Sequence, residues 1–236
     1  MTHDLAVEKL AQAMVKPGTV VTWLNHWSIQ HANWNALAET TSIGFDGTLL
    51  QIVLNRNGYA IGRTSADLVL PVLFNEMLEA GKNIVLIGAA PGVAEKAAER
   101  ITRHTVFAFN GFDDLAEIRK NPTRIGITAP DVIVLGLGAL LQDEVAIEMH
   151  QAFPDAIVCT AGGWIDQFAK NEQYFPPWVH RYRLGWAWRI AHEPRRLLRR
   201  YTIDAVAFVL RHRRYLAKLA ELNRIATRYS LDKTDL

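Results

Sequence analysis

The segment DVIVLGLGALLQDE, residues 131–144, carries the pattern that decides the fold class of this chain. Residues 132–135 are a continuous run of apolar, mostly β-branched side chains, which is typical of a strand buried on both faces. Gly136 and Gly138 allow a tight turn after it, and a helical pattern follows over residues 142–153. A buried strand, a glycine turn and a helix in this order are the repeating unit of a parallel α/β sheet.

The same unit recurs on both sides of this segment. The expected strands are 19–25, 83–88, 105–109, 131–136 and 155–160, and the expected helices are 26–39, 66–80, 93–103, 113–120 and 142–153. This alternation predicts the α/β class with a Rossmann-like, open and mostly parallel sheet. Ligands of such sheets bind in the loops that follow the strands, at their carboxyl ends.

Size and composition fit one large domain with a proper hydrophobic core. The chain has 236 residues, of which 50% are hydrophobic and 21% are charged. Its single cysteine, Cys159, excludes an intrachain disulfide framework and a cysteine-rich zinc site, and fits a reducing compartment. The amino-terminal segment lacks the pattern of a signal peptide, and no run reaches the roughly 18–20 apolar residues that span a bilayer. These features predict a cytosolic protein.

The charge is distributed unevenly along the chain. The net charge is +2, but residues 181–228 contain 13 lysines and arginines against three acidic residues. The pattern of strands also stops before this segment, so we divide the chain into an α/β core, residues 1–177, and a helical, arginine-rich appendage, residues 178–236. The appendage is expected to meet an anionic surface such as lipid headgroups. No nucleic-acid-binding module accompanies the charge, so we expect no nucleic-acid partner.

Several familiar catalytic motifs are missing from the sequence. The segment GLGALL, residues 136–141, begins like a dinucleotide fingerprint but lacks its third glycine. There is no Walker loop, no Gly-x-Ser-x-Gly elbow and no His-Glu-x-x-His motif. The eight histidines lack the spacing of metal ligands, and the Asp-x-Asp motif of many metal-dependent sugar transferases is absent. We therefore predict no cofactor and no metal site, so arginines or helix N-termini would stabilise any leaving diphosphate.

The order and spacing of several blocks resemble a known protein family. The blocks are Thr22 with Asn25, Asp46-Gly47, GRTSADL at 62–68, GAAPGVA at 88–94, PDVIVLGLGALLQDE at 130–144, GGWID at 162–166 and WAWRIAHEPRRLLRRY at 186–201. Over roughly residues 18–205, this pattern resembles the WecB/TagA/CpsF family, which is glycosyltransferase family 26. The last block is its most specific part.

The resemblance implies an inverting, metal-independent glycosyltransferase that acts in the synthesis of bacterial cell-surface polysaccharide. The implied donor is a UDP-sugar that carries a hexose or an N-acetylhexosamine, and the implied acceptor is a polyprenyl-diphosphate saccharide. Together with the basic appendage, it implies a cytoplasmic protein that lies peripherally on the inner face of the cell membrane and contacts its anionic surface. Association into a homo-oligomer is left open.

The resemblance also implies roles for individual residues. Asp46 matches the family's proposed general base, which would take the proton of the acceptor hydroxyl. The candidates for binding the acceptor or its phosphates are Asn25, Arg63, Arg195, Arg199 and Arg200. The candidates for binding the nucleotide-sugar, several of them glycines that let the backbone approach a phosphate, are Gly88, Pro91, Gly92, Gly136, Gly138, Gln142 and Asp166.

Each of these assignments has a structural alternative. Asp46 also fits a turn or a helix N-cap, Asn25 also fits a cap of the next helix, and Arg63 also fits an exposed turn. The sequence departs from the family pattern at Leu140, where the family has proline, and at Asp143, where it has glutamate. A non-catalytic protein that binds a nucleotide-sugar or a lipid intermediate in a polysaccharide assembly complex is therefore the alternative function.

The tryptophans of the appendage admit three interpretations. Trp178, Trp186 and Trp188 are candidates for stacking on sugar rings, for a position at a membrane interface, or for packing of the appendage on the core. The sequence alone leaves these three open.

Overall fold

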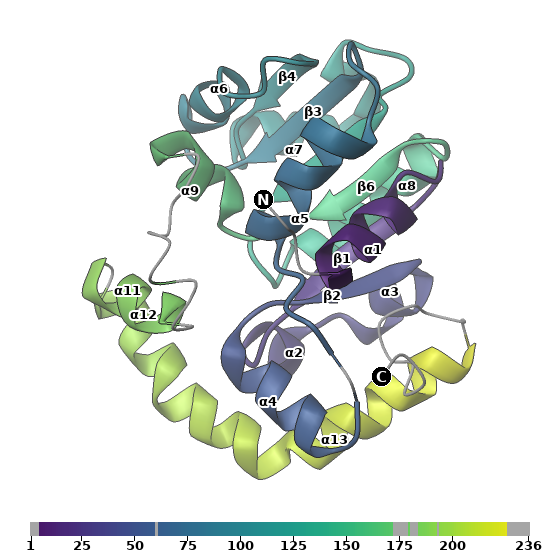
Figure 1. Cartoon of the computed structure of the whole chain (residues 1–236). Helices are drawn as coiled ribbons and strands as arrows, with labels where there is room; N and C mark the ends of the chain where they lie inside the picture. The colour runs from purple at the N-terminus through teal and green to yellow at the C-terminus, as the bar shows by residue number, and fades with distance from the viewer. Residues whose placement is uncertain (1–4, 60, 172–178, 180–183, 193, 226–236) are drawn as a thin grey trace.

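The structure is a computed structural model that describes residues 5–59, 61–171, 179, 184–192 and 194–225 (Figure 1). Its centre is a sheet of six strands in which every neighbouring pair is parallel, in the order β2-β1-β6-β5-β3-β4. The strands are β1 (Val20–Leu24), β2 (Ser42–Phe45), β3 (Asn83–Gly88), β4 (Thr105–Phe109), β5 (Val132–Gly136) and β6 (Ile157–Thr160). The Rossmann-like α/β class predicted from the sequence is confirmed.

Helices cover both faces of the sheet, as the uninterrupted apolar character of its strands requires. They are α1 (Leu5–Met14), α2 (Ser28–His31), α3 (Trp34–Glu39), α4 (Thr48–Arg56), α5 (Ala66–Val72), α6 (Val93–Ala98), α7 (Asp113–Lys120), α8 (Gln142–Ala152) and α9 (Trp164–Lys170), with a π-helical turn at Leu73–Met77 and a 3₁₀ turn at Pro122–Ile125. Side chains of α1, α5, α6 and α9 form the hydrophobic core on one face of the sheet. Side chains of α3, α7 and α8 form the core on the other face.

The close approach of two strands explains two of the glycines in the expected binding loops. Gly88 of β3 pairs with Gly136 of β5. A Cβ atom on Gly88 would lie 2.6 Å from the carbonyl oxygen of Gly136, and one on Gly136 would lie 2.8 Å from Cδ1 of Ile165. The absence of a side chain at both positions therefore serves the packing of the strand ends and of α9.

Strand β2 was not among the expected strands. It has only four residues and contains Gly44, so its apolar run is short. The glycine is needed because a side chain at this position would collide with the indole of Trp23 in the neighbouring strand β1. The expected helix over 26–39 is divided into α2 and α3 by the extended backbone at Ala32 and Asn33.

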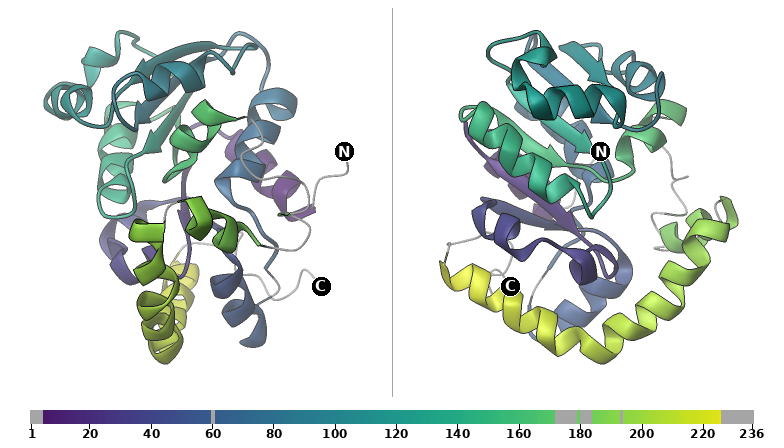
Figure 2. Two further views of the ribbon diagram at one scale, coloured as in Figure 1. Left: turned by 90° about the vertical axis from the view of Figure 1, so that its left-hand side faces the viewer. Right: turned by 180° about the vertical axis from the view of Figure 1, so that it is seen from behind.

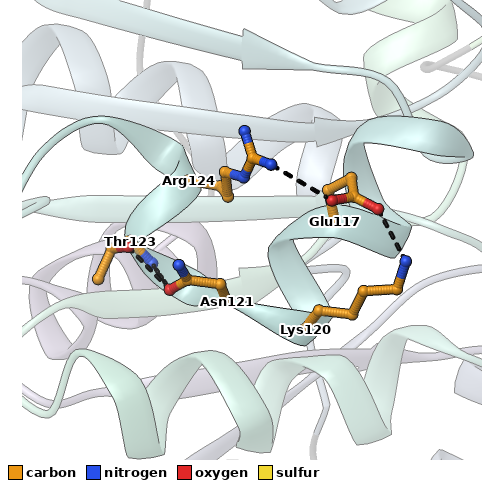
Figure 3. Close-up of polar contacts among 5 residues, drawn as sticks. All are labelled: Glu117, Lys120, Asn121, Thr123 and Arg124. Atoms are coloured by element: carbon orange, nitrogen blue, oxygen red, sulfur yellow. Dashed lines mark hydrogen bonds and ion pairs between the residues drawn. The ribbon is translucent and has the colours of Figure 1, made fainter.

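The connection from α7 to the 3₁₀ turn is held by exposed polar contacts (Figure 3). The Asn121 side chain caps the turn by accepting a hydrogen bond from the Thr123 backbone at 3.2 Å. Glu117 lies 2.8 Å from Lys120 and 3.5 Å from Arg124. Contacts between exposed charged groups contribute little to stability because solvent screens them, so they shape the turn more than they stabilise the fold.

The carboxyl-terminal segment is helical, as predicted. It contains α11 (Gly185–His192), α12 (Pro194–Tyr201) and α13 (Ile203–Ile225). Figures 1 and 2 show α13 running past α2 and α4 at the end of the sheet that carries β2. The predicted boundary at residues 177 and 178, with Trp178, lies outside the described residues. Within the part of the chain that the structure describes, no helix has the length and apolar character to cross a membrane.

A third hydrophobic cluster joins α13 to the core. Its α13 members are Phe208, Tyr215, Leu216, Leu219 and Leu222. They pack with Ile43 and Phe45 of β2 and with Leu50 and Leu54 of α4. By packing, α13 is therefore part of the core.

Candidate active site

The loops that follow β1, β2, β5 and β6 line a cleft of about 630 Å³ at the carboxyl edge of the sheet. This is where ligands bind in open parallel sheets. The appendage closes one side of this cleft through Leu197, Arg199, Arg200 and Asp204. We call this space the larger cavity.

A second space of about 300 Å³, the smaller cavity, lies between the loop after β1, the start of α4 and the helices of the appendage. Of the residues that the structure describes, three line both cavities, namely Asn25, Asp46 and Arg200. The two cavities therefore meet at a carboxylate, an amide and a guanidinium group.

Asp46 directly follows β2 and is half-buried. Its backbone N–H donates to the carbonyl oxygen of Leu24 at 2.8 Å, which extends the pairing of β1 and β2 by one residue. The next residue, Gly47, has a φ of +81°, which favours glycine, and it is the N-cap of α4. Asp46 is thus not the N-cap, and the Asp-Gly pair places its side chain at the end of the sheet, on both cavities.

Asn25 combines a structural contact with a position on both cavities. Its side-chain oxygen Oδ1 accepts hydrogen bonds from the backbone N–H groups of Trp27 and Ser28, each at 2.9 Å. The structural alternative, in which Asn25 caps the helix that follows, therefore accounts for the role of Oδ1. The amide nitrogen Nδ2 makes no hydrogen bond to any residue that the structure describes, which leaves its two donors for a bound molecule.

Among the appendage residues that the structure describes, Arg200 is the arginine that lines both cavities. Its guanidinium group lies 4.9 Å from the ring centre of Trp27 and 5.9 Å from that of Tyr201, within the range of a cation–π contact. Arg199 lines the larger cavity, although its side chain is 79% exposed, and it lies 4.0 Å from Asp204. Arg195 is exposed and lines neither cavity.

His26 was not among the residues expected at the site. It is buried, its Nε2 atom lies 3.1 Å from the carbonyl oxygen of Arg200, and its ring lies 5.3 Å from that of Tyr201. Burial lowers the pKa of this imidazole, so the neutral form is favoured. Gln30 donates from Nε2 to the backbone oxygens of His26 at 2.8 Å and Asp204 at 3.0 Å. Together these contacts attach the carboxyl end of α12 to the loop after β1.

The floor of the larger cavity connects the loops after β5 and β6. Gln142, at the start of α8, is buried and accepts a hydrogen bond from the Gly162 backbone N–H at 3.2 Å through Oε1. Gly138, with a φ of +78°, and Gln142 both line the cavity. Gln142 therefore both begins α8 and lines the larger cavity.

A buried polar network lies beside this floor. Thr22 Oγ1 donates to Asp143 Oδ1 at 2.9 Å and lies 2.9 Å from Thr160 Oγ1. Burial raises the pKa of the Asp143 carboxyl group, while the Thr22 hydroxyl opposes this shift. Asp143, the residue that departs from the family's glutamate, thus ties α8 to the middle of β1 and, through Thr22, to the end of β6. The sequence offered no signal for these contacts because Thr22 and Asp143 are far apart in the chain.

The other predicted residues fall into two groups. Arg63 lines the smaller cavity and pairs with Asp67, which lines the larger one, at 3.6 Å. The remaining five line neither cavity, and they are Gly88, Pro91, Gly92, Gly136 and Asp166. The loop after β3 is therefore not part of the cleft, and the glycine-rich segment there begins α6 with Gly92 in the left-handed conformation.

The arrangement suits a reaction between two bound molecules. A carboxylate shared by two cavities can take a proton from a hydroxyl group in one of them while that oxygen attacks a carbon atom in the other. The Arg200 guanidinium group at the same junction can bind phosphate oxygens in charge-assisted, bidentate hydrogen bonds.

Comparisons with known proteins find relatives that are named as sugar transferases. The UDP-Gal:α-D-GlcNAc-diphosphoundecaprenol β-1,4-galactosyltransferase of Shigella boydii is 28% identical over 201 residues, which cover 81% of this chain and 84% of that protein. The N-acetylglucosaminyldiphosphoundecaprenol N-acetyl-β-D-mannosaminyltransferase of Bacillus spizizenii is 29% identical over 154 residues, which cover 62% of this chain and 60% of that protein. The model of the glycosyl transferase WecG/TagA/CpsF family matches residues 1–222. This match confirms the resemblance found in the sequence, and the chain belongs to the WecG/TagA/CpsF family of glycosyltransferases.

Proposed function

We propose that this chain transfers a hexose or an N-acetylhexosamine from a UDP-sugar to a polyprenyl-diphosphate-linked saccharide, with inversion and without a metal ion, in bacterial cell-surface polysaccharide synthesis. Membership of the family supports the glycosyl transfer. The names of the Shigella and Bacillus proteins support an acceptor that carries N-acetylglucosamine on undecaprenyl diphosphate. The observation that carries the proposal is the position of Asp46 on both cavities.

In this proposal the donor occupies the larger cavity and the acceptor saccharide enters from the smaller one. Asp46 takes the proton of the acceptor hydroxyl while the hydroxyl oxygen forms a bond to the anomeric carbon of the donor sugar. The bond from that carbon to the diphosphate breaks on the opposite face, and UDP leaves with the electron pair. This in-line displacement inverts the anomeric centre and needs one carboxylate.

The described residues supply charge and donors for both diphosphates. Arg199 and Arg200 line the larger cavity, where the negative charge of the leaving UDP develops. Arg63 and Arg200 line the smaller cavity, where the diphosphate of the acceptor would lie. Gly138 and Gln142 remain our candidates for contact with the donor, whereas Gly88 and Gly136 are explained by packing.

The transfer itself is the first test. The purified chain, given a UDP-hexose or UDP-N-acetylhexosamine and an N-acetylglucosaminyl-diphosphoprenol, is expected to form product in the presence of EDTA, as followed by mass spectrometry. A folded sample that forms no product with any donor would refute the proposal. Stabilisation by the nucleotide-sugar without turnover would favour the non-catalytic alternative, since a ligand at 100 times its Kd adds about 2.7 kcal/mol.

We also propose that the appendage holds the enzyme peripherally on the anionic inner face of the cell membrane. Ile203, Val206 and Leu210 are exposed and share one face of α13 because they are three and four residues apart. Exposed arginines flank this face at 211, 213 and 214. An exposed apolar face bordered by cations fits the boundary between headgroups and acyl chains, and each cation near an anionic surface contributes about 1 kcal/mol.

The membrane proposal predicts the effect of one substitution on α13. Leu210→Asn is expected to lower the fraction of protein that sediments with phosphatidylglycerol-containing vesicles, with a partition coefficient reduced by about tenfold from the lost apolar transfer. Leu5→Asn, at an exposed leucine of α1 outside the appendage, should leave sedimentation unchanged. Equal sedimentation of the Leu210 variant and the wild type would contradict the proposal.

A further inference from the structure

The smaller cavity has two chemically different parts. One part is polar, and its lining residues are Asn25, His26, Asp46, Arg63 and Arg200. The other part is apolar, and its main lining residues are Leu49, Ile52, Trp186, Tyr201 and Ala205. A cavity that places two guanidinium groups beside an apolar surface fits a ligand with an anionic head and a hydrocarbon chain.

The apolar part is formed mostly by side chains outside the hydrophobic core. On α4, Leu50 and Leu54 are buried in the third hydrophobic cluster, and Leu49 packs against that cluster from the edge of the cavity. Ile52 lines the cavity without being part of the cluster. Ile52 is 39% exposed and Trp186, on α11, is 47% exposed. Large apolar side chains that gather at a cavity from separate helices indicate a binding surface.

A series of aromatic contacts links the cationic part to the apolar part. The Arg200 guanidinium lies 5.9 Å from the ring of Tyr201, and that ring lies 6.5 Å from the ring of Trp186. On the other wall, α4 begins at Thr48, two residues after Asp46, and Ile52 lies four residues further along this helix, about 6 Å at the helical rise. A ligand that extends from Asp46 past Arg200 therefore reaches the apolar side chains.

We propose that this apolar part binds the isoprene units next to the diphosphate of the acceptor, with the diphosphate held by Arg63 and Arg200. The inference rests on the proposed function and deepens it, because it names the part of the acceptor that the smaller cavity recognises. The chemical order of such an acceptor is saccharide, diphosphate and hydrocarbon. The cavity offers a carboxylate, two arginines and an apolar surface to these three parts.

The size of the cavity limits what it recognises. Its volume of about 300 Å³ is at the small end of ligand sites, and it also holds the diphosphate. Only the first isoprene units fit, so the remainder of a long chain leaves past the exposed side chains of Ile52 and Trp186. Recognition therefore depends on the beginning of the chain and not on its length.

Binding of a short prenyl diphosphate tests this inference without relying on turnover. By calorimetry, farnesyl diphosphate is expected to bind the wild-type chain at least about tenfold more tightly than inorganic pyrophosphate, because apolar surface is buried in addition to the charged contacts. Ile52→Asn should remove most of this difference and leave the Kd of pyrophosphate unchanged. Trp186→Ala, on a different helix, should act in the same direction, and Ile52→Leu should keep the preference.

The matched control is Val15→Asn. Val15 is 38% exposed, close to the 39% of Ile52, but it follows α1 and lines neither cavity. It should leave both dissociation constants unchanged. Equal affinity of the wild type for the two ligands, or an equal loss of both in the Ile52→Asn variant, would overturn the inference.

Kinetics separate this inference from the proposed function. With a saccharide acceptor that carries a prenyl chain on its diphosphate, Ile52→Asn should raise KM several-fold at unchanged kcat. With a saccharide acceptor that carries only a methyl group on its diphosphate, this substitution should change neither KM nor kcat. A wild type that transfers sugar but shows no preference for the prenyl chain would refute the isoprene subsite alone. A wild type that prefers farnesyl diphosphate but transfers no sugar would refute the proposed function and leave the subsite standing.

Discussion

Replacing Asp46 with asparagine is expected to lower kcat by about 10²–10⁴-fold, the usual contribution of a positioned general base. Asparagine keeps the size of the side chain but does not accept the proton of the acceptor hydroxyl. Because Asp46 lies at the junction of the cavities and not at the floor of the donor cleft, the affinity for the UDP-sugar should be retained. Initial rates with saturating acceptor and calorimetry with the donor measure the two quantities separately.

Asp204→Asn is the matched control for this substitution. Asp204 also lines the larger cavity, but it lies beside Arg199 at 4.0 Å and does not line the smaller cavity. The decrease in kcat caused by Asp204→Asn should be much smaller than the decrease caused by Asp46→Asn. If both variants lost the same activity, the effect would reflect the total charge of the cleft. Full activity of Asp46→Asn would remove this carboxylate from the mechanism.

Replacing Arg200 with glutamine is expected to lower kcat/KM for the acceptor by about 10²–10³-fold, the cost of removing one preorganised donor from a site of developing charge. Arg200 is the one arginine among the described residues that lines both cavities. Lysine at this position should recover only part of the loss, because its ammonium group does not bind phosphate oxygens bidentately. The measurement is the acceptor dependence of the rate at saturating donor.

Arg195→Gln distinguishes contact in the site from charge on the helix. Arg195 lies on the same helix, α12, and carries the same charge, but it is exposed and lines neither cavity. In a soluble assay with a short-chain acceptor, this variant should stay close to the wild type. Similar losses for Arg195→Gln and Arg200→Gln would show that α12 acts through its total charge, against the role proposed for Arg200.

The fold was largely predictable because most of its strands are uninterrupted apolar runs. The strand over residues 132–136 and its glycine turn identified a buried parallel strand directly. Strand β2 was not predicted because Gly44, which makes room for Trp23, leaves only a short apolar segment. Local patterns describe single elements, whereas the reason for Gly44 lies in a neighbouring strand.

The residues of the candidate site could be predicted to the extent that they follow strands on one side of the sheet. Asn25, Asp46 and Gln142 follow β1, β2 and β5 and line the cavities. The residues after β3 do not, because β3 and β4 lie at the opposite end of the sheet from β2. Local sequence patterns do not predict the order of the strands in the sheet. They also do not predict the contact of His26 with Arg200, which lies 174 residues away in the chain.

The way α13 packs affects how shortened versions of this chain should be interpreted. β2 is an edge strand, and α13 buries its apolar side chains together with Leu50 and Leu54. Removal of α13 would uncover this surface beside unpaired backbone groups, a combination that promotes aggregation. A truncated protein that is inactive would then report lost solubility and not a missing substrate contact, so single substitutions on α12 are the informative design.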